Sequence, residues 1–320
     1  MRRFCIIIMD DTTLIDFTSC PIDTGAQYGG SDQKRGIIYK GDRYMLKFPD
    51  RIPDAKHNSL NSTYSNSIYS EKICCDILHE LGFDVQTAIL GFVQFSRECK
   101  PVVACKNFVP SGSVLLSFKT IANSLLPKKL GKVPKLSEIY AVLSNPSPYF
   151  SREAGEVALH AYWDLFILDA FLGNFDRHCI SWGYIYSPDR SFLVPSTIYG
   201  CSSCLYPQIS DDAIPAILQS TDEIILHVDK YPTAALLDSN DTRVNYKQFI
   251  SSFTNKDCTE ALLRIFPRID MKIVKAVIDD SSSISDVRKR FYSTMLQVRY
   301  TRILAGAYNS QAELSSSYFT

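Results

Sequence analysis

The sequence predicts an α+β fold with two lobes, a small β-rich lobe followed by a larger helical lobe. Residues 1–110 carry short apolar runs bounded by turn signals, with one helical pattern among them. Residues 111–320 carry mostly the helical spacing of apolar side chains. The chain has 320 residues, 46% of them hydrophobic, which is enough for a bilobal protein with a large core.

The first lobe is predicted to be a sheet of short strands with one helix. The turn Lys40-Gly41-Asp42 separates two apolar runs, which is typical of a β-hairpin. Apolar residues recur every three or four positions over residues 67–81, which predicts a helix that Gly82 ends. The predicted strands are residues 4–9, 37–39, 44–48, 89–93 and 102–105.

The second lobe is predicted to be built around the helix 152–172, which has the most regular apolar stripe in the chain. After it, residues 182–186 and 192–194 flank a Ser-Pro-Asp-Arg turn and predict a second hairpin. Further helices are predicted over residues 212–218, 259–266, 271–277 and 284–307.

The composition excludes several classes of protein. Lys+Arg and Asp+Glu are equal at 34 each, which argues against a dedicated nucleic-acid binder. No apolar run is long enough to span a membrane. The ten cysteines are scattered, as expected for reduced thiols in a cytoplasmic protein. The pair Cys201 and Cys204 is a single C-x-x-C without neighbouring histidines, a weak metal signal.

A polar loop with Asp176, Arg177 and His178 directly follows the helix 152–172. An aspartate held at the end of a buried helix can accept or orient the proton of an attacking hydroxyl, as in the catalytic loop of kinases. Arg177 is expected to neutralise a phosphate, and His178 to brace the loop by hydrogen bonds. The alternative is a plain helix-ending turn with an Asp–Arg ion pair.

Lys47 and Glu71 form a second candidate pair. A strand lysine that faces a cleft can bind phosphates when a helix carboxylate holds it in place. Lys47 lies near the end of a predicted strand, and Glu71 lies early in the helix that follows. The alternatives are an edge-strand lysine that limits aggregation and a glutamate that favours the helix dipole.

Two weaker signals fall on either side of this pair. Residues 25–36 are rich in glycine and could let backbone N–H groups approach phosphates, or form an ordinary flexible turn. Residues 102–108, which include Lys106 and Phe108, lead into the second lobe. In a kinase this strand offers backbone groups to adenine, whereas a plain strand would have no such role.

The motifs and their order resemble the HipA-like kinases, most closely their short cell-translocating branch, the CtkA branch. The resemblance covers nearly the whole chain. It implies a bilobal kinase-like fold that binds ATP with Mg²⁺ and phosphorylates serine or threonine, often on the protein itself. By position it implies Gly29, Gly30 and Lys34 in the phosphate-covering loop, Lys47 and Glu71 as the ion pair, and Asp176 as the catalytic aspartate.

The sequence departs from this family at the two positions that hold the metal ion. Ser181 stands where the family has an asparagine, and Gly200 stands where it has an aspartate. Mg²⁺ prefers carboxylate and phosphate oxygens, so a serine hydroxyl is a weak substitute and glycine offers no side chain. Asp189, at a predicted hairpin tip, and Asp211, with Asp212, are not expected to replace them.

Three functions remain open from the sequence. The chain is a serine/threonine protein kinase with reduced activity, a pseudokinase that binds a nucleotide or a partner, or a kinase of lipids or small molecules. The expected partners are ATP and an unidentified protein, with no nucleic acid and no membrane span. The expected location is cytoplasmic, with transfer into another cell implied by the resemblance alone.

Overall fold

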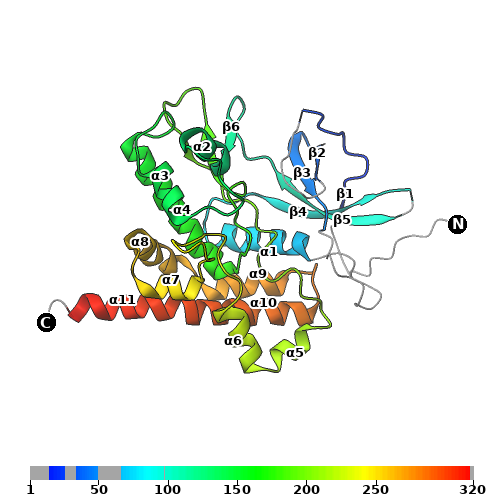
Figure 1. The fold of residues 1–320 in the computed structure, drawn as a ribbon. Coiled ribbons are helices and arrows are strands. Elements are labelled where there is room, and N and C mark those ends of the chain that lie inside the picture. Colours follow the sequence, from blue (N-terminus) through cyan, green and yellow to red (C-terminus); the bar gives the residue numbers. More distant parts are fainter. Residues whose placement is uncertain (1–13, 26–33, 50–65, 97, 318–320) are drawn as a thin grey trace.

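The computed structural model describes residues 14–25, 34–49, 66–96 and 98–317, with side chains up to residue 311. A β-sheet lies on one side of the molecule, and helices lie beside and below it (Figure 1). This arrangement confirms the predicted α+β class. The predicted first strand over residues 4–9, as well as Gly29 and Gly30, lies outside the described residues.

The larger sheet has five strands in the order β1-β4-β5-β3-β2, antiparallel except for the β1–β4 pair. The β2–β3 hairpin turns through Lys40 and Gly41, which have φ angles of 50° and 85°. Positive φ at both central positions matches the twist of the flanking strands. The strands are β1 Ile15–Asp16, β2 Lys34–Tyr39, β3 Asp42–Lys47, β4 Ala88–Gln94 and β5 Cys99–Lys106.

Helix α1 (Ser67–Glu80) packs against β4 and β5 of this sheet (Figure 1). Its apolar side chains, including Ile73 and Ile77, are buried as the helical spacing predicts. The chain then reverses through Gly82, whose φ of 77° glycine adopts without strain. The helix also buries one charged side chain, Glu71, completely.

The long helix α4 (Arg152–Leu172) is the central element of the helical part. Ser151 caps its start by accepting a hydrogen bond from the backbone N–H of Ala154. Gly173, with φ of 72°, ends it in the left-handed conformation. The remaining described helices are α2 Phe118–Leu125, α3 Leu136–Leu143, α5 Ile214–Leu218, α6 Thr221–Asp229, α7 Tyr246–Ser252, α8 Lys256–Ile265, η2 Phe266–Arg268, α9 Met271–Asp280, α10 Asp286–Arg299, η3 Tyr300–Ala305 and α11 Gly306–Ser317.

A second, smaller sheet forms beside α4 from β6 (Val114–Ser117), β7 (Gly183–Tyr186) and β8 (Val194–Pro195). Strands β7 and β8 are the hairpin that the sequence predicts after the Asp176 loop. The division predicted at residue 110 falls in the connection between β5 and β6.

Two helix predictions need correction, one inside the helix and one at its start. Residues 284–307 are not one α-helix, because a π-helical stretch, η3, separates α10 from α11. Helix α8 begins three residues earlier than predicted, because the Asn255 side chain caps it by accepting from the backbone N–H of Cys258.

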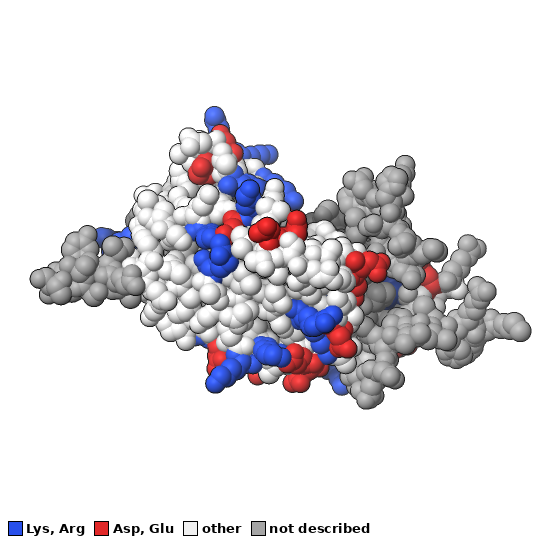
Figure 2. All heavy atoms as spheres, turned by 90° about the horizontal axis from the view of Figure 1, so that it is seen from below, with Lys and Arg blue, Asp and Glu red and all other residues white. Residues whose placement is uncertain are grey.

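Charged side chains of both signs are interspersed around a broad uncharged area on the face seen from below (Figure 2). No helix of the described residues is both long and apolar enough to cross a membrane. The cysteines in the described chain are free thiols, and Cys74, Cys75, Cys105, Cys201 and Cys204 among them are buried.

Asp229 at the end of α6 ties together two other helical segments, and acid should weaken this link. It accepts hydrogen bonds from Arg302 (2.9 and 2.6 Å) and from Lys247 (2.5 Å). The bonds from Arg302, with those from Lys247, lower the pKa of Asp229 to about 2, although partial burial opposes this. Because the folded-state pKa lies below the unfolded value, the ionised carboxylate stabilises the protein above about pH 4. That stabilisation is lost as the pH falls toward 2.

We therefore expect Asp229→Asn to lower the free energy of unfolding at pH 7 by about 1 kcal/mol, since solvent screens part of the interaction. Urea unfolding of the variant and the unchanged protein would measure this at pH 7 and at pH 3. The difference in unfolding free energy between the two proteins should be smaller at pH 3 than at pH 7. A difference that is the same at both pH values would show that the charge of Asp229 has no part in it.

Candidate active site

The loop that carries Asp176 is fixed by the end of α4. Gly173 turns the chain away from the helix, and the backbone N–H groups of Gly173 and Asn174 both donate to the carbonyl of Asp169. The Asn174 side chain then accepts from the backbone N–H of Asp176 at 3.1 Å. Tyr246 donates its hydroxyl to the carbonyl of Asn174 at 2.8 Å. The loop is therefore held by buried hydrogen bonds, which leave the Asp176 side chain partly open to solvent.

Two side chains, Lys132 and His178, lie beside the Asp176 carboxylate, and Ser181 contacts the second of them. The Lys132 ammonium lies 3.2 Å from Oδ1 and 3.4 Å from Oδ2. His178 Nε2 lies 3.7 Å from Oδ2, and His178 Nδ1 is within hydrogen-bond distance of the Ser181 hydroxyl, at 2.9 Å. Burial lowers the pKa of His178 below its ordinary value, although the Asp176 carboxylate opposes this. His178 is thus placed to brace the loop, as the sequence predicts.

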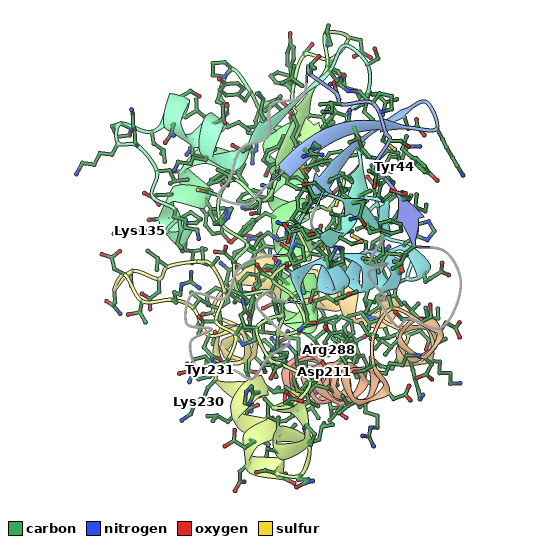
Figure 3. The ribbon with its side chains drawn as sticks, turned by 90° about the vertical axis from the view of Figure 1, so that its right-hand side faces the viewer. Tyr44, Lys135, Asp211, Lys230, Tyr231 and Arg288 are labelled. Carbon is green, nitrogen blue, oxygen red and sulfur yellow. The ribbon has the colours of Figure 1, made fainter. Side chains whose placement is uncertain are left out.

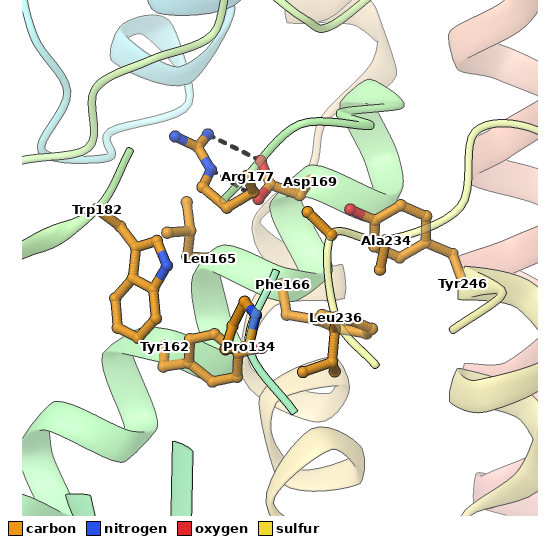
Figure 4. Close-up of a pocket in the computed structure, with 11 residues that line it drawn as sticks. Pro134, Tyr162, Leu165, Phe166, Asp169, Arg177, Trp182, Ala234, Leu236 and Tyr246 are labelled. Atoms are coloured by element: carbon orange, nitrogen blue, oxygen red, sulfur yellow. Dashed lines mark hydrogen bonds and ion pairs between the residues drawn. The ribbon is translucent and has the colours of Figure 1, made fainter. Parts of the chain in front are cut away.

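Arg177 points into the protein, so the expectation that it neutralises a phosphate is wrong. Its guanidinium donates to both carboxylate oxygens of Asp169, at 2.8 and 2.9 Å (Figure 4). The same group donates to the backbone carbonyl oxygens of Ser181, at 3.1 Å, and of Tyr199. All five donors of a guanidinium lie in one plane, so a single arginine can join α4 to these two segments. Arg177 is a structural link between the Asp176 loop and the residues on either side of the second hairpin.

Lys47 and Glu71 form the predicted ion pair. The Lys47 ammonium lies 2.8 Å from Glu71 Oε2, and both side chains are largely buried. Burial lowers the pKa of Lys47, but the Glu71 carboxylate outweighs it and leaves the pKa above its ordinary value, so the lysine stays charged. The other carboxylate oxygen, Glu71 Oε1, accepts from the backbone N–H of Cys201 at 3.1 Å. One carboxylate therefore joins β3, α1 and the segment that follows Gly200.

Ser181 and Gly200 lie side by side, although nineteen positions separate them in the sequence. A Cβ atom placed on Gly200 would lie 3.5 Å from the Ser181 Cβ and 3.2 Å from an Arg177 nitrogen. The two positions therefore converge as a pair of metal ligands would. Their side chains do not fit a magnesium ion, because neither supplies a carboxylate. No group of three or more His, Cys, Asp or Glu side chains in the described chain could hold a metal ion, Cys201 and Cys204 included.

The other predicted site residues lie around the sheet. Lys34 pairs with Lys47 across the β2–β3 hairpin, so two lysines occur at the same end of this hairpin. Lys106 turns its ammonium to Asp42, at 2.6 Å, and its backbone is bonded to the neighbouring segment through Thr87. The Phe108 ring lies 5.5 Å from the ring of Tyr199, next to Gly200.

Asp189 and Asp211, which are not expected to replace the missing metal ligands, lie in other parts of the structure. Asp211 accepts from Arg288 Nε at 2.7 Å, and Figure 3 shows these two residues together in the lower part of the molecule. Asp189 is exposed in the turn between β7 and β8. Neither is placed beside Ser181.

Sequence reasoning missed two residues of this site, Lys132 and Asp169. Lys132 lies in the connection between α2 and α3, 44 residues before Asp176, and its only signal is a set of lysines in the segment Lys-Lys-Leu-Gly-Lys-Val-Pro-Lys. Asp169 could have been found, because a charged residue on the apolar stripe of a long helix needs a buried partner. Arg177 was the nearest candidate for that partner.

The fold resembles that of a chain in a toxin–antitoxin complex of known structure. A chain of the Shewanella oneidensis MR-1 toxin–antitoxin complex of HipA, HipB and operator DNA is 15% identical, with a TM-score of 0.50 over 90% of this chain and 67% of that chain. At this identity the likeness concerns the fold alone. No protein-family model matches the sequence.

A closer match fixes the branch. The chain is 35% identical over 303 residues to the serine/threonine-protein kinase CtkA of Helicobacter pylori strain J99, which is 94% of this chain and 90% of that protein. The crystal structure of the Helicobacter pylori proinflammatory kinase CtkA matches with a TM-score of 0.80 and 34% identity, over 95% of this chain and 100% of that one. The chain therefore belongs to the HipA-like kinase family, in its CtkA branch.

Proposed function

We propose that the chain is a serine/threonine protein kinase of low activity, which transfers the γ-phosphoryl group of ATP to a protein hydroxyl. The ion pair of Lys47 with Glu71 is the observation that carries this proposal. A kinase site needs this pair to hold the phosphates, and here it forms in a buried position. The Glu71 carboxylate also holds the backbone of Cys201, which follows Gly200 beside the Asp176 loop. The similarity to CtkA over most of both chains supports the same class of reaction and a protein acceptor rather than a lipid.

In this proposal each side chain has a separate task. Lys47 binds the phosphates that precede the transferred group, and Asp176 orients the acceptor hydroxyl and takes its proton. His178 and Arg177 do not touch the substrate, because the first braces the loop through Ser181 and the second holds it to α4. The low activity follows from Ser181 and Gly200. Because neither residue supplies a carboxylate to hold a metal ion, the negative charge on the transferred group is not neutralised there.

The same two positions favour the second candidate, a pseudokinase that binds a nucleotide or a protein partner and does not transfer phosphate.

The transfer of label from γ-labelled ATP to the protein, with Mg²⁺ or Mn²⁺, distinguishes the kinase from the pseudokinase. We expect slow labelling that Asp176→Asn lowers about a hundredfold or more. Asp189→Asn is the matched control, since it makes the same change in an exposed turn, and it should have no effect. A folded protein that takes up no label with either metal would be a pseudokinase.

Four further points stay predictions. They are that the acceptor is a protein, that the chain does not bind nucleic acid, that it is located in the cytoplasm, and that it is transferred into another cell. Autophosphorylation is the simplest first case, because the label experiment detects it without a separate substrate.

A further inference from the structure

The positive charge at the transferred phosphoryl group must come from somewhere in this site. Negative charge spreads over three phosphoryl oxygens as the group moves from ATP to the acceptor, and kinases neutralise it mainly through metal ions and basic side chains. Here the two metal-ligand positions, Ser181 and Gly200, lie together without a carboxylate. A side chain with a permanent charge that reaches Asp176 would supply what these positions do not.

Three other cations of the candidate site and its loop have partners of their own. Lys47 is held by Glu71 at 2.8 Å. Arg177 is enclosed by Asp169 and two backbone carbonyls. Arg243 donates to the backbone carbonyl of Phe175 at 3.0 Å. Lys132 is different, because its ammonium contacts the Asp176 carboxylate itself and its side chain is 68% exposed, so the terminal group can change partner.

The backbone that carries Lys132 is fixed to the catalytic loop. The backbone N–H of Cys179, three residues after Asp176, donates to the carbonyl of Lys132 at 3.3 Å. The Cys179 thiol donates to the carbonyls of Gly131, at 3.1 Å, and Lys132, at 3.2 Å. On the other side, buried Leu130 donates its backbone N–H to the Asn123 side chain at 2.7 Å. Because this backbone is fixed, only the side-chain rotamers of Lys132 have to be ordered when its ammonium binds a ligand.

We propose that Lys132 is a catalytic residue that binds the terminal phosphate of ATP and supplies the positive charge that Ser181 and Gly200 do not hold through a metal ion. This inference rests on the proposed function. When ATP is bound, the ammonium moves from Asp176 to an oxygen of the γ-phosphoryl group and frees the carboxylate for the acceptor. The acceptor oxygen forms a bond to the γ-phosphorus as its bond to the β–γ bridging oxygen breaks. The electron pair of that bond leaves with ADP, and the acceptor proton passes to Asp176.

Nucleotide affinity without divalent metal tests this directly. ATP and ADP binding would be measured by calorimetry in EDTA for the unchanged protein and for Lys132→Ala, Lys132→Arg and Lys129→Ala. Because the lost contact is a charged one to the γ-phosphate, Lys132→Ala should weaken ATP binding about tenfold or more and leave ADP binding unchanged. Lys132→Arg keeps the charge and should retain most of the affinity. Lys129→Ala removes an exposed lysine of the same connection and should change nothing.

The outcomes separate this inference from the proposed function. If the protein binds ATP more tightly than ADP and Lys132→Ala abolishes that difference, the contact of Lys132 with the terminal phosphate stands, and label transfer decides whether chemistry follows. If ATP binds and Lys132→Ala has no effect, Lys132 has no role at the phosphate, but the proposed function stands. If Lys132→Ala binds ATP more tightly, the lysine only blocks Asp176, and the inference is overturned. If the unchanged protein binds neither nucleotide in EDTA, the inference is overturned, and the proposed function is decided by the label transfer with Mg²⁺ or Mn²⁺.

Discussion

The double variant Ser181→Asn, Gly200→Asp is expected to transfer phosphate in Mg²⁺ about a thousandfold faster than the unchanged protein, because it adds a carboxylate and an amide oxygen at the two converging positions. Gly200 has a φ of 78°, a conformation that aspartate and asparagine adopt more readily than other residues with a side chain. The nearest atom to a Cβ at this position is an Arg177 nitrogen, at 3.2 Å, which would lie beside the new carboxylate. Initial rates of label transfer over a range of Mg²⁺ concentrations would measure the gain.

Gly200→Ala is the control for this experiment. It adds the same Cβ in the same left-handed conformation but no ligand, so it should not raise the rate. A double variant that is folded, binds ATP and is no faster than the unchanged protein would show that the site fails for a reason other than its metal ligands.

The substitution Arg177→Met is expected to lower the free energy of unfolding by about 3–5 kcal/mol. It leaves Asp169 as a buried charge without its bidentate partner, which is the costly way to break a buried ion pair. It also removes the donor from the carbonyl oxygens of Ser181 and Tyr199. Chemical denaturation would show a lower midpoint with an unchanged slope if the effect is on stability alone.

Arg264→Met gives the matched comparison, because Arg264 also pairs with an aspartate, Asp164, at 2.7 Å, but in a partly exposed position. Its loss should cost about 1 kcal/mol or less. Replacing both members of the buried pair, with Arg177→Met and Asp169→Leu together, should recover part of the stability, since no unpaired charge is then left. If Arg177→Met and Arg264→Met lower the free energy of unfolding equally, burial does not make the Arg177–Asp169 pair more costly to break.

The sequence was a good guide wherever the signal was local. The hairpin turn at Lys40 and Gly41, the apolar stripe of α1 and the helix that precedes Asp176 each follow from residues within a few positions of one another. The order of a strand lysine and a helix glutamate was enough to predict that Lys47 and Glu71 meet. For the turn and the two helices, backbone preference and burial favour the same structure, so one segment is sufficient for the prediction. The Lys47–Glu71 pair joins two segments and was predicted from the order of their elements.

The sequence was a poor guide where a side chain had a choice of partners. Arg177 could have faced a phosphate or the core, and only the position of Asp169, in the last turn of α4, decides for the core. Lys132 reaches Asp176 across 44 residues of chain, a contact set by how α2, α3 and the loop pack together. Asp211 accepts a hydrogen bond from Arg288, which is also far away in the sequence. Such long-range pairings depend on the whole fold, so no local pattern predicts them.

The double contact of Glu71 makes two parts of the site thermodynamically dependent on each other. Its oxygens hold the Lys47 ammonium and the Cys201 backbone at the same time, so a shift of α1 changes the phosphate side and the Gly200 segment together. Linkage then requires reciprocity: a ligand that draws Lys47 toward itself alters the equilibrium of the Gly200 segment, and whatever fixes that segment alters the affinity for the ligand by the same factor. A protein that bound α1 from outside would therefore be expected to change the positions of Lys47 and of the Gly200 segment together, without touching either.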